Sequence, residues 1–259
     1  MQTVVCFGDS LTRGQFSANY VDMLAGRPDL SGYHFTNAGV NSDLTLNLVR
    51  RVKRVAARLP DQVIIMIGSN DVIATVRPFS AAFFVLIKGM HRPVSLGYSM
   101  RNITEVIHYL QEHTQAKIAL CSIPPLGEGL SSSPMQLVRL YNAALRKVAR
   151  KEGAAYLPVF EQLTAYLAAV NGNGGRVYNG SVFLTVEFVM RHVITRETFD
   201  RYSARKGFAL MTDGVHLNRL GASIVAREIE KYLLGTAPAA HGMLKVENQD
   251  QPNPPNLHG

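Results

Sequence analysis

Short apolar segments recur along the chain and predict the strands of a sheet. They are rich in β-branched residues and are bounded by polar or turn-forming residues, which is typical of buried strands. The segments span residues 2–7, 33–36, 62–67, 117–122 and 154–159. The pattern therefore predicts five strands, all in the first two thirds of the chain.

Helical patterns separate these predicted strands. Apolar residues recur at helical spacing over 44–59, 103–110 and 137–148. Residues 133–136, with the sequence Ser-Pro-Met-Gln, lie just before the last pattern and offer an N-cap at Ser133, an early proline and a capping-box glutamine. Strands that alternate with helices predict βαβ units, and hence an α/β fold in which helices cover both faces of a central parallel sheet.

Two long segments do not fit this alternation. Residues 77–97 contain an apolar run, and residues 172–211 begin with a glycine-rich turn and continue through apolar and basic positions. Because long loops in a compact domain usually form lids or binding walls, we expect both to be insertions in a single domain over residues 1–235. Neither is apolar over the about 20 residues of a membrane span, so no transmembrane segment is predicted. Residues 236–259 lack apolar periodicity, which predicts a disordered tail.

Positive charges outnumber negative charges, and the formal net charge is +8. Such a balance is typical of proteins that bind nucleic acids or anionic membranes. The densest basic cluster, however, lies within residues 50–58 and alternates with the apolar positions of the predicted helix over 44–59. These charges fit the solvated face of an amphipathic helix, so no nucleic-acid partner is expected.

The cysteines and histidines give no sign of a metal site. Cys6 and Cys121 lie in apolar runs and are expected to be buried free thiols, without a disulfide framework. No cysteine or histidine has metal-ligand spacing, so neither a metal nor an organic cofactor is predicted. Residues 1–7 show no basic leader and no cleavage site, so the chain as given is expected in the cytoplasm.

The residues that follow the predicted strands are candidates for chemistry, because ligands of parallel α/β sheets bind at the carboxyl ends of the strands. These residues are 8–10, 37–39, 68–71 and 123–125. Ser10 follows the first strand, at a turn where a serine commonly caps the next helix or where a helix N-terminus holds an anion. The same hydroxyl becomes a nucleophile when a base removes its proton. Ser10 alone does not choose between these interpretations.

His216 fits the role of such a base. A neutral histidine, with a reference pKa of about 6.5, accepts a proton near neutral pH. His216 lies in a short polar loop, residues 212–216, before a last helix that Asn218 is expected to cap. Asp213 precedes it by three residues, so the carboxylate can accept the Nδ1 proton and leave Nε2 facing the serine. A solvated Asp–His pair in a turn is the alternative.

Gly39 and Asn70 are candidates for stabilising a tetrahedral oxyanion. A glycine lets its backbone N–H approach a substrate closely, and an asparagine side chain donates hydrogen bonds without carrying a titratable charge. Acyl transfer depends on preorganised donors of this kind. Gly39 as a turn residue and Asn70 as a helix cap are the alternatives.

Four separated motifs together resemble the SGNH or GDSL hydrolase family. In chain order they are Gly8-Asp9-Ser10-Leu11, Asn37-Ala38-Gly39, Gly68-Ser69-Asn70-Asp71 and Asp213-Gly214-Val215-His216. The resemblance covers roughly residues 3–234 and implies a three-layer flavodoxin-like fold around a parallel sheet of about five strands. It also implies a triad and an oxyanion hole. The implied triad is Ser10, Asp213 and His216, and the implied oxyanion donors are the Ser10 and Gly39 backbone amides and the Asn70 side chain.

The implied function is hydrolysis of a small-molecule carboxylic ester through an acyl-enzyme on Ser10. Phe83 and Phe84, in the apolar run of residues 77–97, are predicted to contact an acyl chain, although a core or dimer contact fits them equally. We therefore expect lipid-like or short acyl esters. Peripheral contact with a membrane and the oligomeric state are left open.

Three other functions use the same residues differently. A carbohydrate O-deacetylase would use the same triad, although the chain has no tryptophan to form a sugar platform. A catalytically silent binding module would keep the fold without needing the triad. A phosphate-binding flavodoxin-like domain, with Asp9 as phospho-acceptor, leaves the pairing of Asp213 with His216 unexplained.

Overall fold

The computed structural model describes residues 1–76, 84–89, 93–172, 174–180 and 182–236. Its centre is a sheet of five parallel strands in the order β2-β1-β3-β4-β5. The strands are β1 (Gln2–Gly8), β2 (Tyr33–Gly39), β3 (Gln62–Met66), β4 (Lys117–Cys121) and β5 (Ala155–Leu157). All five predicted strands are present in the order of flavodoxin-like folds, so the predicted fold class is confirmed.

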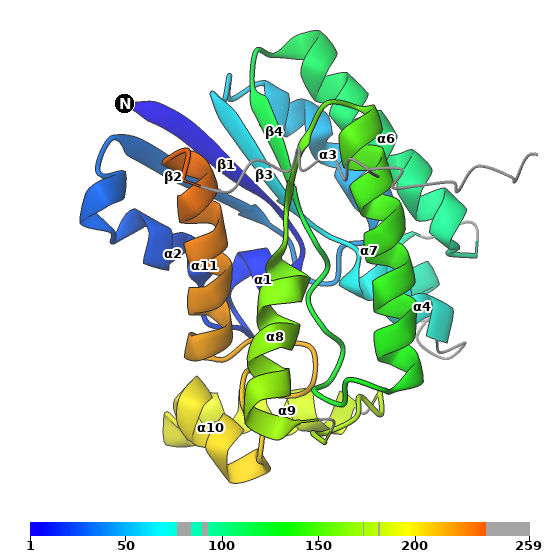
Figure 1. Ribbon diagram of the computed structural model, residues 1–259, viewed down its shortest axis with the longest axis vertical. Helices are drawn as coiled ribbons and strands as arrows, with labels where there is room; N and C mark the ends of the chain where they lie inside the picture. The colour runs from blue at the N-terminus through cyan, green and yellow to red at the C-terminus, as the bar shows by residue number, and fades with distance from the viewer. Residues whose placement is uncertain (77–83, 90–92, 173, 181, 237–259) are drawn as a thin grey trace, which may run out of the picture.

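Helices connect the strands and cover both faces of the sheet (Figure 1). Between β1 and β2 lie α1 (Ser10–Arg13), α2 (Tyr20–Ala25) and the 3₁₀ helix η1 (Pro28–Leu30). Further along the chain come α3 (Thr45–Ala56), α4 (Ser69–Val76), α6 (Leu96–His113) and α7 (Ser133–Lys151). After β5 come α8 (Val159–Asn171), α9 (Val182–Thr195), α10 (Phe199–Lys206) and α11 (Arg219–Leu233).

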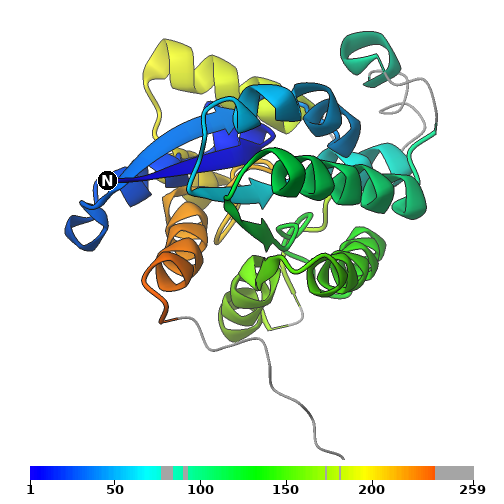
Figure 2. The same ribbon diagram turned by 90° about the horizontal axis from the view of Figure 1, so that it is seen from above.

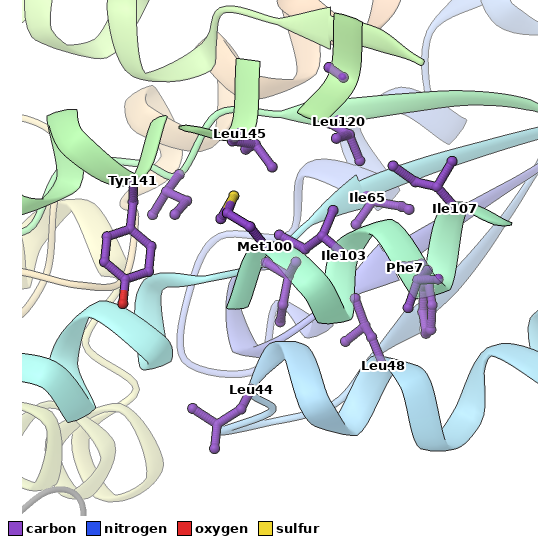
Figure 3. Packing of buried hydrophobic residues seen from close by; sticks show 14 of the residues in the cluster. Phe7, Leu44, Leu48, Ile65, Met100, Ile103, Ile107, Leu120, Tyr141 and Leu145 are labelled. Carbon is purple, nitrogen blue, oxygen red and sulfur yellow. The ribbon is translucent and has the colours of Figure 1, made fainter. Parts of the chain in front are cut away.

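Alternate residues of the strands face two separate hydrophobic cores. In β1, Val5 and Phe7 pack into one core, while Val4 and Cys6 pack into the other. The first core lies between the sheet and α3, α6 and α7, whose side chains meet those of β1, β3 and β4 (Figure 3). The second lies under α2, α8 and α11, so that α8 and α11 flank the sheet opposite α3 and α6 (Figure 2). A period of two in buried strands therefore produces three layers.

The predicted helices are present, with one correction at a helix start. α3 and α6 form where the patterns over 44–59 and 103–110 predicted them, and α6 begins earlier, at Leu96. α7 includes Ser133, so Ser133 is not its N-cap. The reason is that the first helical hydrogen bond runs from the Gln136 N–H to Ser132 O, at 3.0 Å, which places the cap one residue earlier.

The two predicted insertions contain helices where the structure describes them. Residues 84–88 form a helical turn, and residues 172–211 contain α9 and α10, which lie near the carboxyl ends of the strands (Figure 1). The predicted tail and residues 77–83 and 90–92 lie outside the described residues. No described helix combines the length and the apolar character that a membrane span requires. The domain limits and the cytoplasmic location stay predictions.

Phe84 lies in the hydrophobic core. Its side chain is 4% exposed and belongs to the core between the sheet and α3, α6 and α7. The three residues that follow it, Val85, Leu86 and Ile87, are instead 50%, 82% and 57% exposed. Phe83 lies outside the described residues. The structure favours the core alternative for Phe84, and the acyl contact of both phenylalanines stays a prediction.

We expect Phe84→Ala to lower the free energy of unfolding by about 3–5 kcal/mol, because the substitution leaves a cavity in a packed core. Chemical denaturation measures this loss. Relative rates on esters from acetyl to palmitoyl should match those of the unchanged protein, since the side chain faces the core. A flattened chain-length profile without a loss of stability would place Phe84 in an acyl site instead.

Candidate active site

Ser10 is the first residue of α1 and follows directly on the end of β1. Asp9 is the N-cap residue, and its Oδ1 accepts the Leu11 N–H at 3.0 Å, so Asp9 caps this helix and Ser10 does not. The Ser10 N–H makes no hydrogen bond with another described residue. The hydroxyl is therefore presented at the carboxyl end of the sheet beside an unused backbone donor.

Two hydrogen bonds join Ser10 to the loop between α10 and α11. His216 Nε2 lies 3.1 Å from Ser10 Oγ, and His216 Nδ1 lies 2.8 Å from Asp213 Oδ2. The other oxygen of Asp213 accepts the backbone N–H groups of Val215 and His216, at 3.0 and 2.8 Å. All three predicted side chains are buried, and Asn218 caps α11 as expected. The structure thus lines up a carboxylate, an imidazole and a hydroxyl.

A buried carboxylate that the sequence analysis did not identify holds this loop. Glu128 is fully buried, and its side chain accepts the backbone N–H groups of residues 209–211 at 2.9, 2.7 and 3.1 Å. At the other end of the loop, the Thr212 N–H donates to His216 O at 2.8 Å. Hydrogen bonds to an ionised carboxylate are stronger than those between neutral groups. The loop is therefore fixed without any contact from a substrate.

The electrostatic surroundings of His216 favour its protonated form. Burial lowers the pKa of His216, but the charge and hydrogen bond of Asp213, together with the charge of Asp9, raise it above its ordinary value overall. Burial also raises the pKa of Asp9 to about 7, and the Asp9 Oδ2 has no hydrogen-bond partner among the described residues. Asp9 and His216 therefore influence each other's protonation.

Asn70 is the second residue of α4, and the loop before α3 orients its side chain. Asn70 Nδ2 donates to Asp43 O at 3.0 Å, which uses one of its two N–H bonds. The neighbouring Asp71 accepts the Thr45 N–H at 3.0 Å and the Thr45 and Ser99 hydroxyls at 2.7 Å each. α3, α4 and α6 therefore meet at the buried carboxylate of Asp71. The second Nδ2 hydrogen of Asn70 is left to donate to a ligand.

Gly39 does not have the available amide that the sequence suggested. Its N–H donates to Asn37 Oδ1 at 3.0 Å, and Asn37 Nδ2 in turn donates to Thr12 O at 2.7 Å. A Cβ on Gly39 would lie 2.2 Å from Arg13 N, so a glycine is needed here for the packing of α1 against β2. This geometry corrects the predicted oxyanion role of Gly39, because Asn37 already takes the donor.

Ser42, which the sequence analysis did not identify, lies in the loop that orients Asn70. Its φ is +60°, a left-handed conformation that residues other than glycine rarely adopt. It belongs to a turn closed by the Asp43 N–H, which donates to Val40 O at 3.2 Å. The Ser42 N–H makes no hydrogen bond with another described residue. A strained residue with an unused donor thus adjoins the residue whose carbonyl holds Asn70.

Asp43 is held between two cations from different segments. Arg51 Nε lies 2.7 Å from Asp43 Oδ2, and Lys88 Nζ lies 2.9 Å from Asp43 Oδ1. Arg51 also donates to backbone carbonyls at the ends of β1 and β2, at 2.6 Å each, so it does not belong to the solvated face predicted for its helix. Lys88 comes from the insertion over residues 77–97. This insertion therefore reaches the residue that orients Asn70.

The described residues offer no metal centre. No group of three or more histidine, cysteine, aspartate or glutamate side chains among them is arranged to hold a metal ion. Cys6 and Cys121 are buried free thiols, and burial raises the pKa of each. The expected absence of a cofactor stays a prediction.

The chain belongs to the GDSL-like lipase/acylhydrolase family, whose sequence model matches residues 6–224. This membership confirms the resemblance that the four motifs carried. It also makes the protein a carboxylic ester hydrolase by class. No curated protein sequence matches the chain.

Solved structures with this fold include esterases. The acetyl xylan esterase AlAXEase is 21% identical with a TM-score of 0.64, over 89% of this chain and 99% of that one. Axe2, an acetylxylan esterase from Geobacillus stearothermophilus, is 19% identical with a TM-score of 0.62, over 89% and 93%. A lipase/acylhydrolase from Enterococcus faecalis is 18% identical with a TM-score of 0.59, over 91% and 97%. Identities this low establish the fold and leave the substrate to be determined.

We expect Lys88→Met to lower kcat roughly 10-fold, about 1.4 kcal/mol of transition-state stabilisation, with KM little changed. The reason is that Asp43 loses one of the two cations that hold it, and Asp43 orients Asn70. Lys88→Arg should restore most of the rate, because a guanidinium also pairs with the carboxylate. Steady-state kinetics on a chromogenic ester measure both constants.

The exposed Lys147 offers a matched control, since Lys147→Met removes the same charge far from Asp43 and should leave both constants unchanged. Asn70→Ala removes the donor itself and should lower kcat on the order of 100-fold or more, which sets the upper limit for the effect of misplacing it. A rise in KM with kcat intact in Lys88→Met would show that Lys88 contacts the substrate and does not position Asn70.

Proposed function

We propose that Ser10 is the nucleophile of this ester hydrolase, that His216 is its general base and that Asp213 orients His216. The observation that carries the proposal is the continuous hydrogen-bond chain from Asp213 through His216 to Ser10. A serine hydroxyl is a poor nucleophile until a base takes its proton. With its Nδ1 proton held by the carboxylate, His216 has Nε2 available as that base.

The reaction proceeds in two halves. Ser10 Oγ attacks the ester carbonyl carbon while His216 Nε2 takes the hydroxyl proton, and the carbonyl oxygen becomes an oxyanion. Collapse of this intermediate breaks the bond to the leaving alcohol, which receives the proton from His216. A water molecule, deprotonated by His216, then attacks the acyl-enzyme, and the carboxylic acid leaves as Ser10 regains its proton.

For the oxyanion we propose three donors: the Ser10 N–H, the second Nδ2 hydrogen of Asn70, and the Ser42 N–H in place of that of Gly39. Two observations support this set. The backbone donors of Ser10 and Ser42 have no acceptor among the described residues, and Asp43 O holds the Asn70 amide in one orientation. Donors that are fixed before the reaction contribute typically 100- to 1000-fold each to kcat.

The substrate that we propose is a small-molecule ester with a short or lipid-like acyl group. The Phe16 ring, 5.9 Å from the His216 ring, gives the site an apolar neighbour that suits such a group. A carbohydrate O-deacetylase is the second candidate, because two of the solved structures with this fold are named acetyl xylan esterases. Initial rates on esters from acetyl to palmitoyl, measured beside an acetylated xylo-oligosaccharide, separate the two candidates.

We expect Ser10→Ala to abolish both ester hydrolysis and labelling by a fluorophosphonate probe, with thermal unfolding close to that of the unchanged protein. His216→Ala should lose nearly as much kcat, and the double variant little more, because members of a triad act as a unit. As a control, Ser31→Ala removes an exposed hydroxyl elsewhere and should leave labelling unchanged. Additive losses, or labelling that survives Ser10→Ala, would refute the assignment.

The activity should depend on pH through His216. Because only the neutral imidazole accepts a proton, kcat/KM should fall as pH decreases through its pKa, with a midpoint above about 6.5 since that pKa is raised. Asp213→Asn removes the carboxylate whose charge and hydrogen bond do most to raise the pKa of His216. Burial should then bring this pKa below its ordinary value. NMR titration of the imidazole in a Ser10→Ala background measures the midpoint without requiring turnover.

Burial raises the pKa of Asp9 to about 7, so Asp9 also titrates near neutral pH and needs its own control. Asp9→Asn keeps a side chain that can cap α1 and removes one smaller cause of the raised pKa, so the midpoint should move down by less than in Asp213→Asn. An acidic limb in kcat/KM that disappears in Asp9→Asn would assign the limb to Asp9 and contradict the assignment to His216.

A further inference from the structure

A basic cavity lies next to the end of α1, on the side of the edge strand β2. Its volume is about 230 Å³, and it is lined by Arg13, Arg51, Arg54 and Arg58 around residues 37–40. None of the described residues that line it is acidic. The cavity therefore gathers four guanidinium groups around the backbone at the carboxyl end of a strand.

Most of this positive charge has no counter-charge among the residues that the structure describes. Arg51 pairs with Asp43, but Asp43 is shared with Lys88. The side chains of Arg13, Arg54 and Arg58 make no ion pair or hydrogen bond with any described residue. They differ in this from Arg51. Burial lowers the pKa of Arg51, and the nearby charge of Arg54 adds to this effect against the opposing influence of Asp43.

The solvated face of α3 does not account for this arrangement. Arg54 lies on that face and Arg58 follows the end of α3, but Arg13 comes from α1, and Arg51 is directed inward to the ends of β1 and β2. The two helices converge on one cavity because α1 packs directly against Gly39, where a Cβ would meet Arg13 N at 2.2 Å. A cavity built from two helices and a strand end has the form of a binding site, whereas a solvated helix face has no walls.

Arg13, which lines the cavity, lies on the same short helix as the proposed nucleophile, and Ser10 itself is not a lining residue. Arg13 is the last residue of α1 and Ser10 is the first, so the two backbones are about 4.5 Å apart along the helix axis. A substrate that is bound at Ser10 and extends along α1 therefore reaches Arg13 within one turn of the helix. Planar guanidinium groups bind phosphate through pairs of parallel hydrogen bonds, which suits a site with several arginines and no acid.

We propose that this cavity binds a phosphate group, and that the group belongs to the alcohol part of the ester substrate. The assignment to the substrate rests on the function proposed for Ser10, whereas phosphate binding itself does not. An ester whose leaving alcohol carries a phosphate would be held by the arginines while its carbonyl reaches Ser10. Free phosphate is the other source of the same chemistry, and the two arms of the experiment distinguish them.

The first arm measures binding without turnover, using inorganic phosphate as the probe. Phosphate at ten times its dissociation constant should raise Tm by at least about 2 °C relative to sodium chloride at equal ionic strength. Arg54→Gln/Arg58→Gln should lose this increase. The matched control, Lys53→Gln/Lys147→Gln, removes the same number of charges from exposed positions that do not line the cavity and should keep it.

The second arm measures substrate preference. Two esters share one acyl group, and the leaving alcohol is 3-hydroxypropyl phosphate in one and 1,3-propanediol in the other. The kcat/KM of the phosphorylated ester divided by that of the neutral ester should be about 10 in the unchanged protein and in the lysine control. This ratio corresponds to a tenfold difference in binding of the transition state. In Arg54→Gln/Arg58→Gln the ratio should fall to about 1.

Each outcome decides part of the proposal. A phosphate-dependent Tm increase that is the same in the arginine and lysine variants, or that is absent from the unchanged protein, overturns the site. An increase that needs the arginines, with an ester ratio near 1 throughout, keeps the site and assigns it to free phosphate. If hydrolysis does not depend on Ser10 while phosphate binding still needs Arg54 and Arg58, the proposed function fails and the phosphate site stands.

Discussion

The close approach of α1 to the ends of β1 and β2 is the constraint on which the rest of the site depends. A Cβ on Gly8 would lie 2.2 Å from Thr12 Oγ1, and one on Gly39 would lie equally close to Arg13 N. These glycines face each other in register on neighbouring strands. Because neither has a side chain, a helix of four residues lies on the sheet itself, with the proposed nucleophile at its start and an arginine at its end.

Buried carboxylates hold the loops that surround this helix. Asp71 joins α3, α4 and α6, Asp213 shapes the loop between α10 and α11, and Glu128 fixes the start of that loop. A buried carboxylate is destabilising unless hydrogen bonds satisfy it, so each of these loops is stable in the one conformation that supplies the donors. The groups that meet a substrate are consequently positioned in advance, which is what an electrostatic mechanism of rate enhancement requires.

The fold and the alignment of Asp213, His216 and Ser10 were predictable because their signals are local: apolar runs, helical spacing and short motifs after strands. Glu128 and Lys88 were not, since their partners lie 81 and 45 positions away and nothing beside either residue marks them. The conformational freedom of Gly39 was compatible with a turn residue and with an oxyanion donor. Only the geometry shows that its backbone N–H already donates to the Asn37 side chain. Arg51 looked solvated because its inward contacts arise only when α3 packs on the sheet.

The proposed nucleophile and its proposed base lie 206 positions apart, and contacts between segments far apart in the chain bring them together. The Ser17 hydroxyl donates to Leu217 O and accepts the Leu217 N–H, and α11 packs beside α2 (Figure 1). During translation the N-terminal segments leave the ribosome first, so the nascent chain carries its serine long before its histidine. A partly synthesised chain that ends before Asp213 and His216 therefore lacks the hydrogen-bond chain proposed for catalysis, which is complete only once most of the protein has been made.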